Sequence, residues 1–304
     1  MHITKHITLG IILIFALSFT VGCDERHDSP VTSPYYGGIN GLEAEFEDIG
    51  RVSDTGERIS VWEDDDIPIS VILRNRGEYT IPAHSVDMRI RGIAQSDFSG
   101  ISFQKDNPEE IDKVTEYLPE GGQLYIDFGN ARYNYLEGTH YDANFFMEYT
   151  YPYETYINIP RVCYKANIRD DSVCTVDSTK QAFASGGPIQ VRTVQQRYIG
   201  RGKIMLEIPI ENVGGGHAKA HENDEFDPNR DEVYFRINDA DWDCQSPGGA
   251  SSNIARISSG GETKIRCIND NLEADALYTK SVTLTLEYHY KDRISQTVRI
   301  MAEP

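Results

Sequence analysis

Apolar residues recur at every second position in many segments of the chain, which is the period of a β-strand that buries one face. The apolar face of one such segment consists of Leu284, Leu286, Tyr288 and Tyr290. Turn residues separate the segments of this kind, which span residues 59–62, 67–74, 86–90, 124–128, 145–151, 189–194, 203–210, 233–237, 264–268, 282–290 and 296–301. The pattern predicts an all-β fold, in which only residues 107–117 could form a short helix.

The same order of strands and turns occurs twice along the sequence. Residues 71–77 match residues 207–214, because each segment is a strand followed by an Asn-x-Gly turn. Three further matches follow in the same order and pair residues 88–90 with 235–237, 121–126 with 260–265, and 148–151 with 287–290. An acidic insertion at residues 217–230 lengthens the second copy. The repeat predicts two tandem immunoglobulin-like β-sandwiches that arose by internal duplication, at residues 39–160 and 188–304.

The N-terminal segment has the pattern of an export signal. Residues 1–23 contain no Asp or Glu, begin with basic residues and continue as an apolar run that ends at Cys23. The junction Thr20-Val21-Gly22-Cys23 resembles a lipoprotein box, in which the cysteine thiol receives a diacylglyceryl group. Thr20 departs from the Leu, Val or Ile usual in such boxes, so ordinary secretion or an uncleaved anchor is the alternative. We expect a signal peptide at residues 1–23, a lipid on Cys23 and a polar stalk at residues 24–38.

Four cysteines remain once Cys23 is assigned to the lipid, an even number that suits disulfide bonds in an oxidising compartment. Four cysteines allow three pairings. The local pairing joins Cys163 to Cys174, within a linker at residues 161–187, and Cys244 to Cys267. Each half of the chain then closes its own loop, and each disulfide contributes about 3 kcal/mol. A four-cysteine metal site is the alternative, although the close CxxC spacing of zinc ribbons does not occur.

Net charge limits the classes of partner. Lys and Arg number 29 and Asp and Glu number 48, which gives a formal charge of −19. The basic residues are scattered, whereas nucleic-acid binding needs a concentrated cationic surface, so this function is excluded. A polytopic membrane protein is excluded as well, because one apolar run is all that the sequence offers.

Several of these features together resemble a known class of surface protein. The Asn-x-Gly turns after strands, the closing Glu-Tyr-x-Tyr segments and the lipoprotein-like start are similar to those of archaeal-type surface lipoproteins with tandem immunoglobulin-like, CARDB-like domains. The resemblance covers residues 39–304 and rests on turns and strands. It implies display at the cell surface and a role in binding or spacing, and it brings no catalytic residues with it.

The acidic insertion and its flank hold the candidate metal ligands. Asp227, Asn229 and Asp231 have the alternate spacing of the first oxygen ligands in a calcium loop. The sequence then departs from such loops, because Glu232 stands where a Gly makes the sharp turn. The calcium candidates are therefore an irregular set that consists of Asp224, Asp227, Asn229, Asp231 and Glu232. A solvated acidic loop is the alternative.

Three weaker candidates have simpler structural interpretations. His217 and His221 have the spacing of two zinc ligands on a helix, but three glycines precede them and favour a loop. The acidic residues 63–66 are a second candidate calcium site, in the first copy, and they adjoin a strand. A run of tyrosines could stack on sugars, but its period of two favours a core role. That run consists of Tyr149, Tyr151, Tyr153 and Tyr156.

The sequence contains no nucleophile elbow, phosphate loop or dinucleotide-binding fingerprint. We therefore expect a non-enzymatic, lipid-anchored, extracytoplasmic protein that presents a binding, adhesion or spacer surface at the cell envelope. A cell-surface protein or a glycan is the expected partner, besides the membrane itself and further copies of the chain. No cofactor is expected apart from the candidate calcium. A carbohydrate- or solute-binding lipoprotein is the first alternative and a secreted hydrolase is the second.

Changing Cys23 to Ser tests the lipid assignment, because it removes the thiol that would carry the acyl chains. Two acyl chains are what stable anchoring requires, so we expect Cys23→Ser to move the protein from the membrane fraction to the soluble fraction. Immunoblotting of fractionated cells measures the distribution. Thr20→Leu, which keeps the thiol, is the control and should stay with the membrane. Retention of Cys23→Ser in the membrane fraction would contradict the assignment.

Overall fold

The structure, a computed structural model, describes residues 31–49, 51–52, 59–134, 138–248, 253–258 and 261–302. Its contacts separate the chain into Met1–Thr32 and Ser33–Pro304, and all the described strands belong to the second unit. The expected signal peptide and Cys23 lie outside the described residues. Apart from a 3-10 turn at Gln95–Asp97, the elements of the described residues are strands, so the predicted all-β fold is confirmed.

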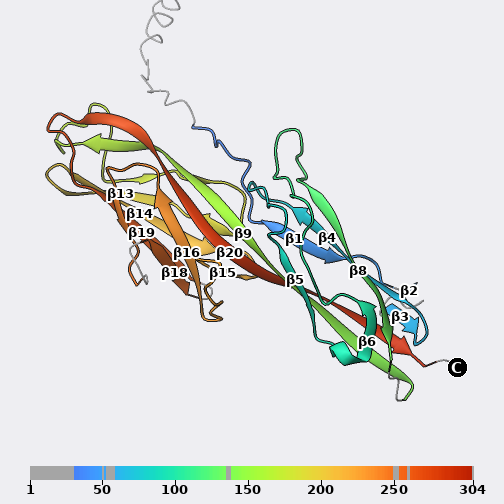
Figure 1. Cartoon of the computed structure of the whole chain (residues 1–304). Coiled ribbons are helices and arrows are strands. Elements are labelled where there is room, and N and C mark those ends of the chain that lie inside the picture. Colours follow the sequence, from blue (N-terminus) through green and yellow to red (C-terminus); the bar gives the residue numbers. More distant parts are fainter. Residues whose placement is uncertain are drawn as a thin grey trace, which may run out of the picture. The chain divides into compact units, whose positions relative to one another are not determined.

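The described strands form three sheets (Figure 1). The first sheet has the order β1 (Leu42–Phe46), β4 (Ile67–Asn75), β8 (Gln123–Tyr133) and β6 (Phe98–Ile101). The second has the order β10 (Ser178–Lys180), β13 (Val194–Gly200), β14 (Lys203–Asn212), β19 (Glu262–Asn269) and β17 (Asp243–Gln245), with β12 (Ile189–Val191) also paired to β14.

The third sheet has the order β18 (Ile254–Ser258), β16 (Arg230–Ile237), β20 (Leu277–Met301), β9 (His140–Lys165), β5 (Asp87–Arg91) and β7 (Gln104–Lys105). Short strands flank it, namely β11 (Phe183–Ala184) on β9, β15 (His217–Lys219) and β3 (Ile59–Trp62) on β20, and β2 (Arg51–Val52) on β3. The pairing of β3 with β20 is parallel, and the other pairings are antiparallel.

The two long strands β9 and β20 pair along almost their whole length. Lys165 lies opposite Leu277 at one end of this ladder, and His140 lies opposite Met301 at the other. In Figure 1 they are the green and red ribbons that run side by side. The sequence pattern predicts only residues 145–151 of β9, which lie in its first half, and it divides β20 into two strands. The polar residues 291–295 nevertheless continue β20, because residues 146–150 of β9 pair with them.

The third sheet packs against both other sheets. Near the start of β9, the Phe145 ring lies 5.7 Å, centroid to centroid, from Phe98 in the first sheet. Near the end of β9, the side-chain amide of Gln196 in the second sheet accepts from the N–H of Cys163 at 3.0 Å and donates to its C=O at 2.7 Å. Within the third sheet, β20 pairs with β16 in its first half and with β3 at its end. The buried apolar residues of the three sheets therefore form one cluster.

The expected boundary between residues 160 and 161 lies inside β9. Ile159 is opposite Val282 and Val162 is opposite Lys280, so two residues of β9 face one of β20. This is a β-bulge, and it contains Pro160, which has no N–H to donate, and Arg161, whose φ is +55°. The bulge lets the strand continue past a proline. The division into residues 39–160, 161–187 and 188–304 stays a prediction.

Tyrosines fill the inner face of the β9–β20 ladder. Five of them are at most 3 % exposed, namely Tyr149, Tyr151, Tyr153, Tyr288 and Tyr290. The core interpretation of Tyr149, Tyr151 and Tyr153 is thus confirmed, whereas Tyr156 is half-buried. Tyr151 lies directly opposite Tyr290, and their ring centroids are 5.9 Å apart.

The buried hydroxyl groups of these tyrosines are hydrogen-bonded, as a dry core requires. The Tyr153 hydroxyl donates to the C=O of Gly186 at 2.6 Å, and the Tyr151 hydroxyl accepts from the N–H of Leu42 at 3.3 Å. Burial raises the pKa of Tyr151 and Tyr288 well above the usual value, because the phenolate form would lose its hydration. These side chains are therefore neutral and serve as structural cross-links between segments.

Asn75 and Asn212 organise the two Asn-x-Gly turns in the same way. Each side-chain Oδ1 accepts from the N–H of the glycine two residues later, Gly77 or Gly214, at 3.1 Å in both turns. Each Nδ2 donates to the carbonyl four residues later, at 2.7 Å after Asn75 and 3.0 Å after Asn212. The amide thus replaces backbone partners in a tight turn, which is a common role of asparagine.

The surroundings of the two turns also correspond. Leu42 of β1 lies opposite Asn75, and Ile189 of β12 lies opposite Asn212. A Cβ atom on Gly77 would lie 1.8 Å from the Tyr153 hydroxyl, and one on Gly214 would lie 2.2 Å from the Tyr290 hydroxyl. Glycine is needed at both positions because a core tyrosine reaches the turn.

Residues 107–117 form no helix, so that expectation was wrong. Ile111 instead makes an isolated bridge with Ile81, and both are fully buried. Asn107 is buried as well, and its Oδ1 accepts from the N–H groups of Ser85 and Val86 at 3.0 and 2.8 Å. The segment therefore uses its polar groups to bind a neighbouring loop, and the apolar spacing that could suit a helix serves a bridge.

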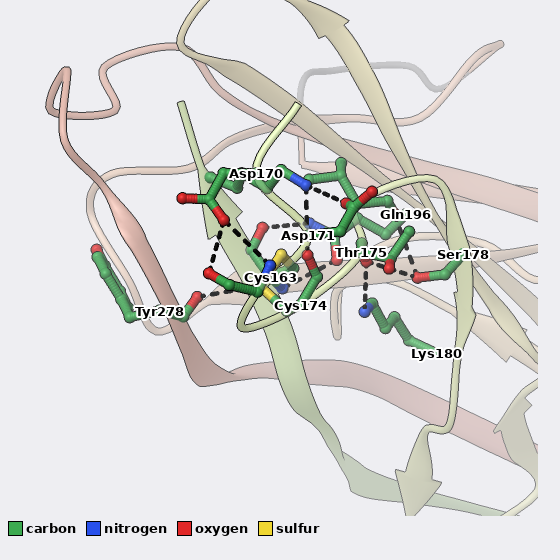
Figure 2. The surroundings of a disulfide bond; sticks show 12 residues. Cys163, Asp170, Asp171, Cys174, Thr175, Ser178, Lys180, Gln196 and Tyr278 are labelled. Atoms are coloured by element: carbon green, nitrogen blue, oxygen red, sulfur yellow. Dashed lines mark hydrogen bonds and ion pairs between the residues drawn. A yellow bond between two sulfur atoms is a disulfide. The ribbon is translucent and has the colours of Figure 1, made fainter. Parts of the chain in front are cut away.

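The predicted disulfide pairing is confirmed. Cys163 is bonded to Cys174 and Cys244 to Cys267. Figure 2 shows the first bond, beside which the Lys180 ammonium donates to the C=O of Thr175 at 3.2 Å. Disulfides persist in oxidising compartments, so the two bonds indicate an extracytoplasmic environment. Within the described ranges, no helix has the length and apolarity needed to cross a membrane.

Substitution of the glycine in the second turn tests how closely the tyrosine approaches it. In Gly214→Ala, the new methyl group would meet the Tyr290 hydroxyl and, at 2.8 Å, the Cβ of Pro188. We expect the free energy of unfolding to fall by about 2–3 kcal/mol, measured by urea denaturation. Gly215→Ala is the matched control, since no atom lies within 4 Å of its Cβ position, and it should change stability by less than about 0.5 kcal/mol. Equal losses in the two variants would contradict this account of the turn.

Candidate functional site

The carboxylate of Glu78 binds the segment that leads from the N-terminus into the fold. Its oxygens accept from the N–H of Tyr36 at 3.1 Å, of Gly37 at 2.9 Å and of Gly186 at 2.7 Å. The N–H of Glu78 itself donates to the C=O of Gly186 at 3.2 Å. One side chain after the first Asn-x-Gly turn therefore joins the N-terminal segment to the segment between β11 and β12. We call this arrangement the Glu78 clamp.

Gln190 extends the Glu78 clamp from the side of the second copy. Its Nε2 lies within hydrogen-bonding distance of three carbonyl oxygens, those of Gly38 at 3.0 Å, Ser185 at 3.1 Å and Gly187 at 2.8 Å. The N–H of Gly187 also donates to the C=O of Gly38 at 3.3 Å. Residues 36–38, the end of the expected stalk, are therefore bound to the body of the protein. No sequence motif predicts this contact between residues 36–38 and the body.

A surface groove lies over the middle of the β9–β20 ladder, on the face opposite the tyrosines. Pro152 and His289 are directly opposite each other in the ladder and line this groove. The loop before β5 contributes His84, and the insertion of the second copy contributes Glu222. Both halves of the sequence thus supply residues to one hollow.

Two histidine side chains, those of His84 and His289, line this groove. His84 has a φ of +58°, which is rare for a residue with a side chain, and its Nδ1 lies 2.9 Å from the Asp106 carboxylate. The pKa of His289 is lowered, first because burial disfavours its charged form and then because Lys219 is positively charged. The groove therefore offers one imidazole beside a carboxylate and one that tends to stay neutral, which suits the binding of a small polar solute.

The acidic insertion does not place His217 and His221 on a helix. His217 begins the short strand β15, which pairs with β20, and its Nδ1 lies 3.3 Å from the Asp231 carboxylate. The His221 ring packs against Tyr234 with a centroid distance of 5.7 Å. The two histidines therefore have different partners. In the part of the chain that the structure describes, no group of three or more His, Cys, Asp or Glu residues is arranged to hold a metal ion.

Asp231, one of the calcium candidates, is a structural carboxylate. It is 4 % exposed and accepts from the N–H of Ala218 at 2.8 Å and from Asn212 Nδ2 at 2.9 Å. It thereby ties the insertion to the second Asn-x-Gly turn. Sequence spacing cannot reveal this role, because it depends on two segments that come together only in the fold.

The other calcium candidates bind backbone or arginine groups, and Arg230 ion-pairs with both Asp227 and Glu232. Asp224 accepts from the N–H of His221 at 3.0 Å, and Asp227 accepts from the N–H of Asn229 at 2.9 Å. Glu232 accepts from Arg256 at 2.7 Å. The structure does not bring the predicted set together around one point, and a calcium role for it stays a prediction.

The acidic residues 63–66 form a turn in which Asp65 bonds locally and Asp66 reaches Arg132 of β8. Asp65 accepts from the N–H of Trp62 at 3.0 Å, and Asp66 binds Arg132 with its Oδ1 2.7 Å from the guanidinium. These carboxylates stabilise the turn between β3 and β4 and lie beside a strand, as the sequence predicts.

Truncation of Asp231 tests its structural role. Asp231→Ala leaves the Ala218 N–H and the Asn212 amide without their acceptor, so we expect the free energy of unfolding to fall by about 2–3 kcal/mol. Asp227→Ala is the control, because its carboxylate serves an exposed loop, and its cost should stay below about 1 kcal/mol. Urea denaturation with EDTA present throughout measures both variants. Similar losses in the two would contradict the structural role.

No protein-family model matches the chain, and no curated protein shows significant similarity to it.

Proposed function

We propose that the protein is a non-enzymatic, lipid-anchored component of the cell surface, which presents a binding or adhesion surface or acts as a spacer at the envelope. The Glu78 clamp is the observation that carries this proposal. A lipid on Cys23 would hold the chain at the membrane, and residues 36–38 are joined to the body by hydrogen bonds from Glu78 and Gln190. The clamp would therefore fix the point at which the tether joins the body, about a dozen residues, or at most roughly 45 Å, from the lipid.

The long ladder supports the same proposal. A protein that presents a surface or keeps a distance needs a body that keeps its form. Strands β9 and β20 join all three sheets through one buried cluster, and two disulfides close further loops. Both features favour a stable scaffold outside the cytoplasm.

We also infer that the body consists of two immunoglobulin-like sandwiches that arose by duplication and are similar to CARDB-type domains. The equivalent bonding of Asn75 and Asn212 supports this inference. The ladder supports it too, because Tyr151 and Tyr290, which match in the repeat, lie opposite each other. Two copies related by a local two-fold axis would place matched residues in this way.

A solute-binding lipoprotein is the second candidate function, and the groove at Pro152 and His289 favours it. The groove combines imidazoles with carboxylates and receives residues from both copies. A polar solute held there would contact the two halves of the chain at once.

Cross-linking on intact cells tests the proposed function. We expect a membrane-impermeant, amine-reactive cross-linker to label the wild-type protein, with mass spectrometry identifying the linked species. Links to another envelope protein would support adhesion or binding, and links between copies of the chain would support a spacer. Cells that express Cys23→Ser provide the control for retention at the surface. Failure of the reagent to reach the wild-type protein on intact cells, with labelling after lysis, would contradict display at the surface.

A further inference from the structure

The outer face of the first sheet carries an ordered set of side chains in rows across its strands. Because facing residues of paired strands share a side of the sheet, the register defines each row. Glu45 of β1 lies opposite Ile72 of β4, which lies opposite Tyr125 of β8. The neighbouring row on the same face consists of Glu43, Arg74 and Gln123.

The Tyr125 ring is exposed in the middle of a strand. It is 59 % exposed, although it belongs to a sheet whose inner face is a close-packed core. Ile72 beside it is buried, at 9 % exposure, so Tyr125 is the exposed apolar side chain of this row. Polar and charged groups occupy the other positions of the two rows.

A chain of polar contacts holds the Tyr125 ring in place. Gln123 donates from Nε2 to the Tyr125 hydroxyl at 2.6 Å and accepts from Arg74 Nε at 3.1 Å. The Arg74 guanidinium also forms an ion pair with Glu45. These contacts order the side chains before any ligand arrives, which lowers the entropic cost of binding.

A hollow in the surface runs along β1 and β4 beside this row. Ile72 and Arg74 form part of its lining, together with Pro68, Ser70 and the carboxylate of Glu47. The exposed ring thus stands next to a concave area that has an apolar patch and several hydrogen-bonding groups. Binding sites for small molecules commonly combine these properties.

We propose that this face, centred on Tyr125, is a binding site for neutral saccharides. The C–H groups on one side of a sugar ring pack on an aromatic face, while its hydroxyl groups bond with fixed carboxylate, amide and guanidinium groups. Tyr125 supplies the first contact, and Glu45, Gln123 and Arg74 supply the second. Carboxylates outnumber cations on this face, so it disfavours anionic sugars. This assignment rests on the proposed surface function and names its ligand class.

The matching face of the second sheet has a different chemistry. In the repeat, Tyr125 corresponds to Lys264 and Ile72 to Pro209, and these two residues also lie opposite each other in their sheet. Glu207, in the adjacent row, binds both Arg197 and Arg266, with its oxygens 3.1 and 3.3 Å from the guanidinium groups. Ion pairs occur on both faces, and on the first sheet an exposed ring stands where the second sheet has Lys264. The difference points to a role for Tyr125 that the common fold does not require.

Affinity electrophoresis tests the proposal on the full chain. Native gels would contain one neutral polymer each (yeast mannan, laminarin, dextran or glycogen) or an anionic one (hyaluronate). We expect at least one neutral polymer to retard the wild-type protein and hyaluronate to leave its mobility unchanged. Tyr125→Ala should weaken the apparent binding by about tenfold or more, as loss of a central aromatic contact does. Tyr125→Phe, which keeps the ring, should retain most of the binding.

Tyr117→Ala is the matched control, because Tyr117 is a 94 % exposed tyrosine that lies in a loop before β8. It should bind within about twofold of wild type. The proposal is overturned if no neutral polymer retards the protein, if Tyr125→Ala and Tyr117→Ala behave alike, or if only hyaluronate causes retardation. If the protein is labelled on intact cells but binds no saccharide, the saccharide site is wrong and the proposed surface function stands. If it binds saccharide but is not labelled on intact cells, the saccharide site stands and the proposed surface function is contradicted.

Discussion

The antiparallel pairing of β9 with β20 is the constraint on which the other parts of the structure depend. Side chains of a strand alternate between two faces, so the register of this ladder determines which residues enter the core. A slip of β20 by one residue against β9 would bring Tyr290 to the surface and turn His289 inward in its place. Because the ladder contributes to the packing of both other sheets, its register fixes the interior of the whole body at once.

The same alternation separates the side chains that face the core from those that face solvent. The tyrosines on the inner face reach the Asn-x-Gly turns and the segment at Gly186, so their hydroxyl groups hold loops in place. The Glu78 clamp forms at this point, where residues 36 and 37 meet the segment at Gly186. Residues on outer faces are released from packing, and both candidate binding surfaces lie there. The face of the strand on which a residue lies thus decides whether that residue maintains the fold or is available to bind a ligand.

Local features of the fold are readable from the sequence, whereas long-range ones are not. The period of two locates most of the longer strands, and the repeated Asn-x-Gly pattern identifies turns whose bonding is the same in both copies. The four cysteines that remain beside Cys23, with their short spacings, give the disulfide pairing. The full length of β9 cannot be predicted, because a proline such as Pro160 usually ends a strand. Here the pairing with β20 continues on both sides of Pro160 through a bulge. Glu78, Gln190 and Asp231 escape for a related reason, since each binds backbone groups from segments distant in sequence.

The end of β20 has a consequence for the order in which the protein can fold. Val298 and Ile300 are fully buried, β3 pairs with this stretch, and β1 contacts the same strand. The interior around β1 and β3 is therefore incomplete until residues 298–301 are present. Domains of most multidomain chains fold one after another during synthesis, but here strands near the start of the fold depend on β20. A chain exported in the order of its synthesis would cross the membrane before the end of β20 had joined the third sheet, and the apolar side of the first sheet would need protection until that strand arrived.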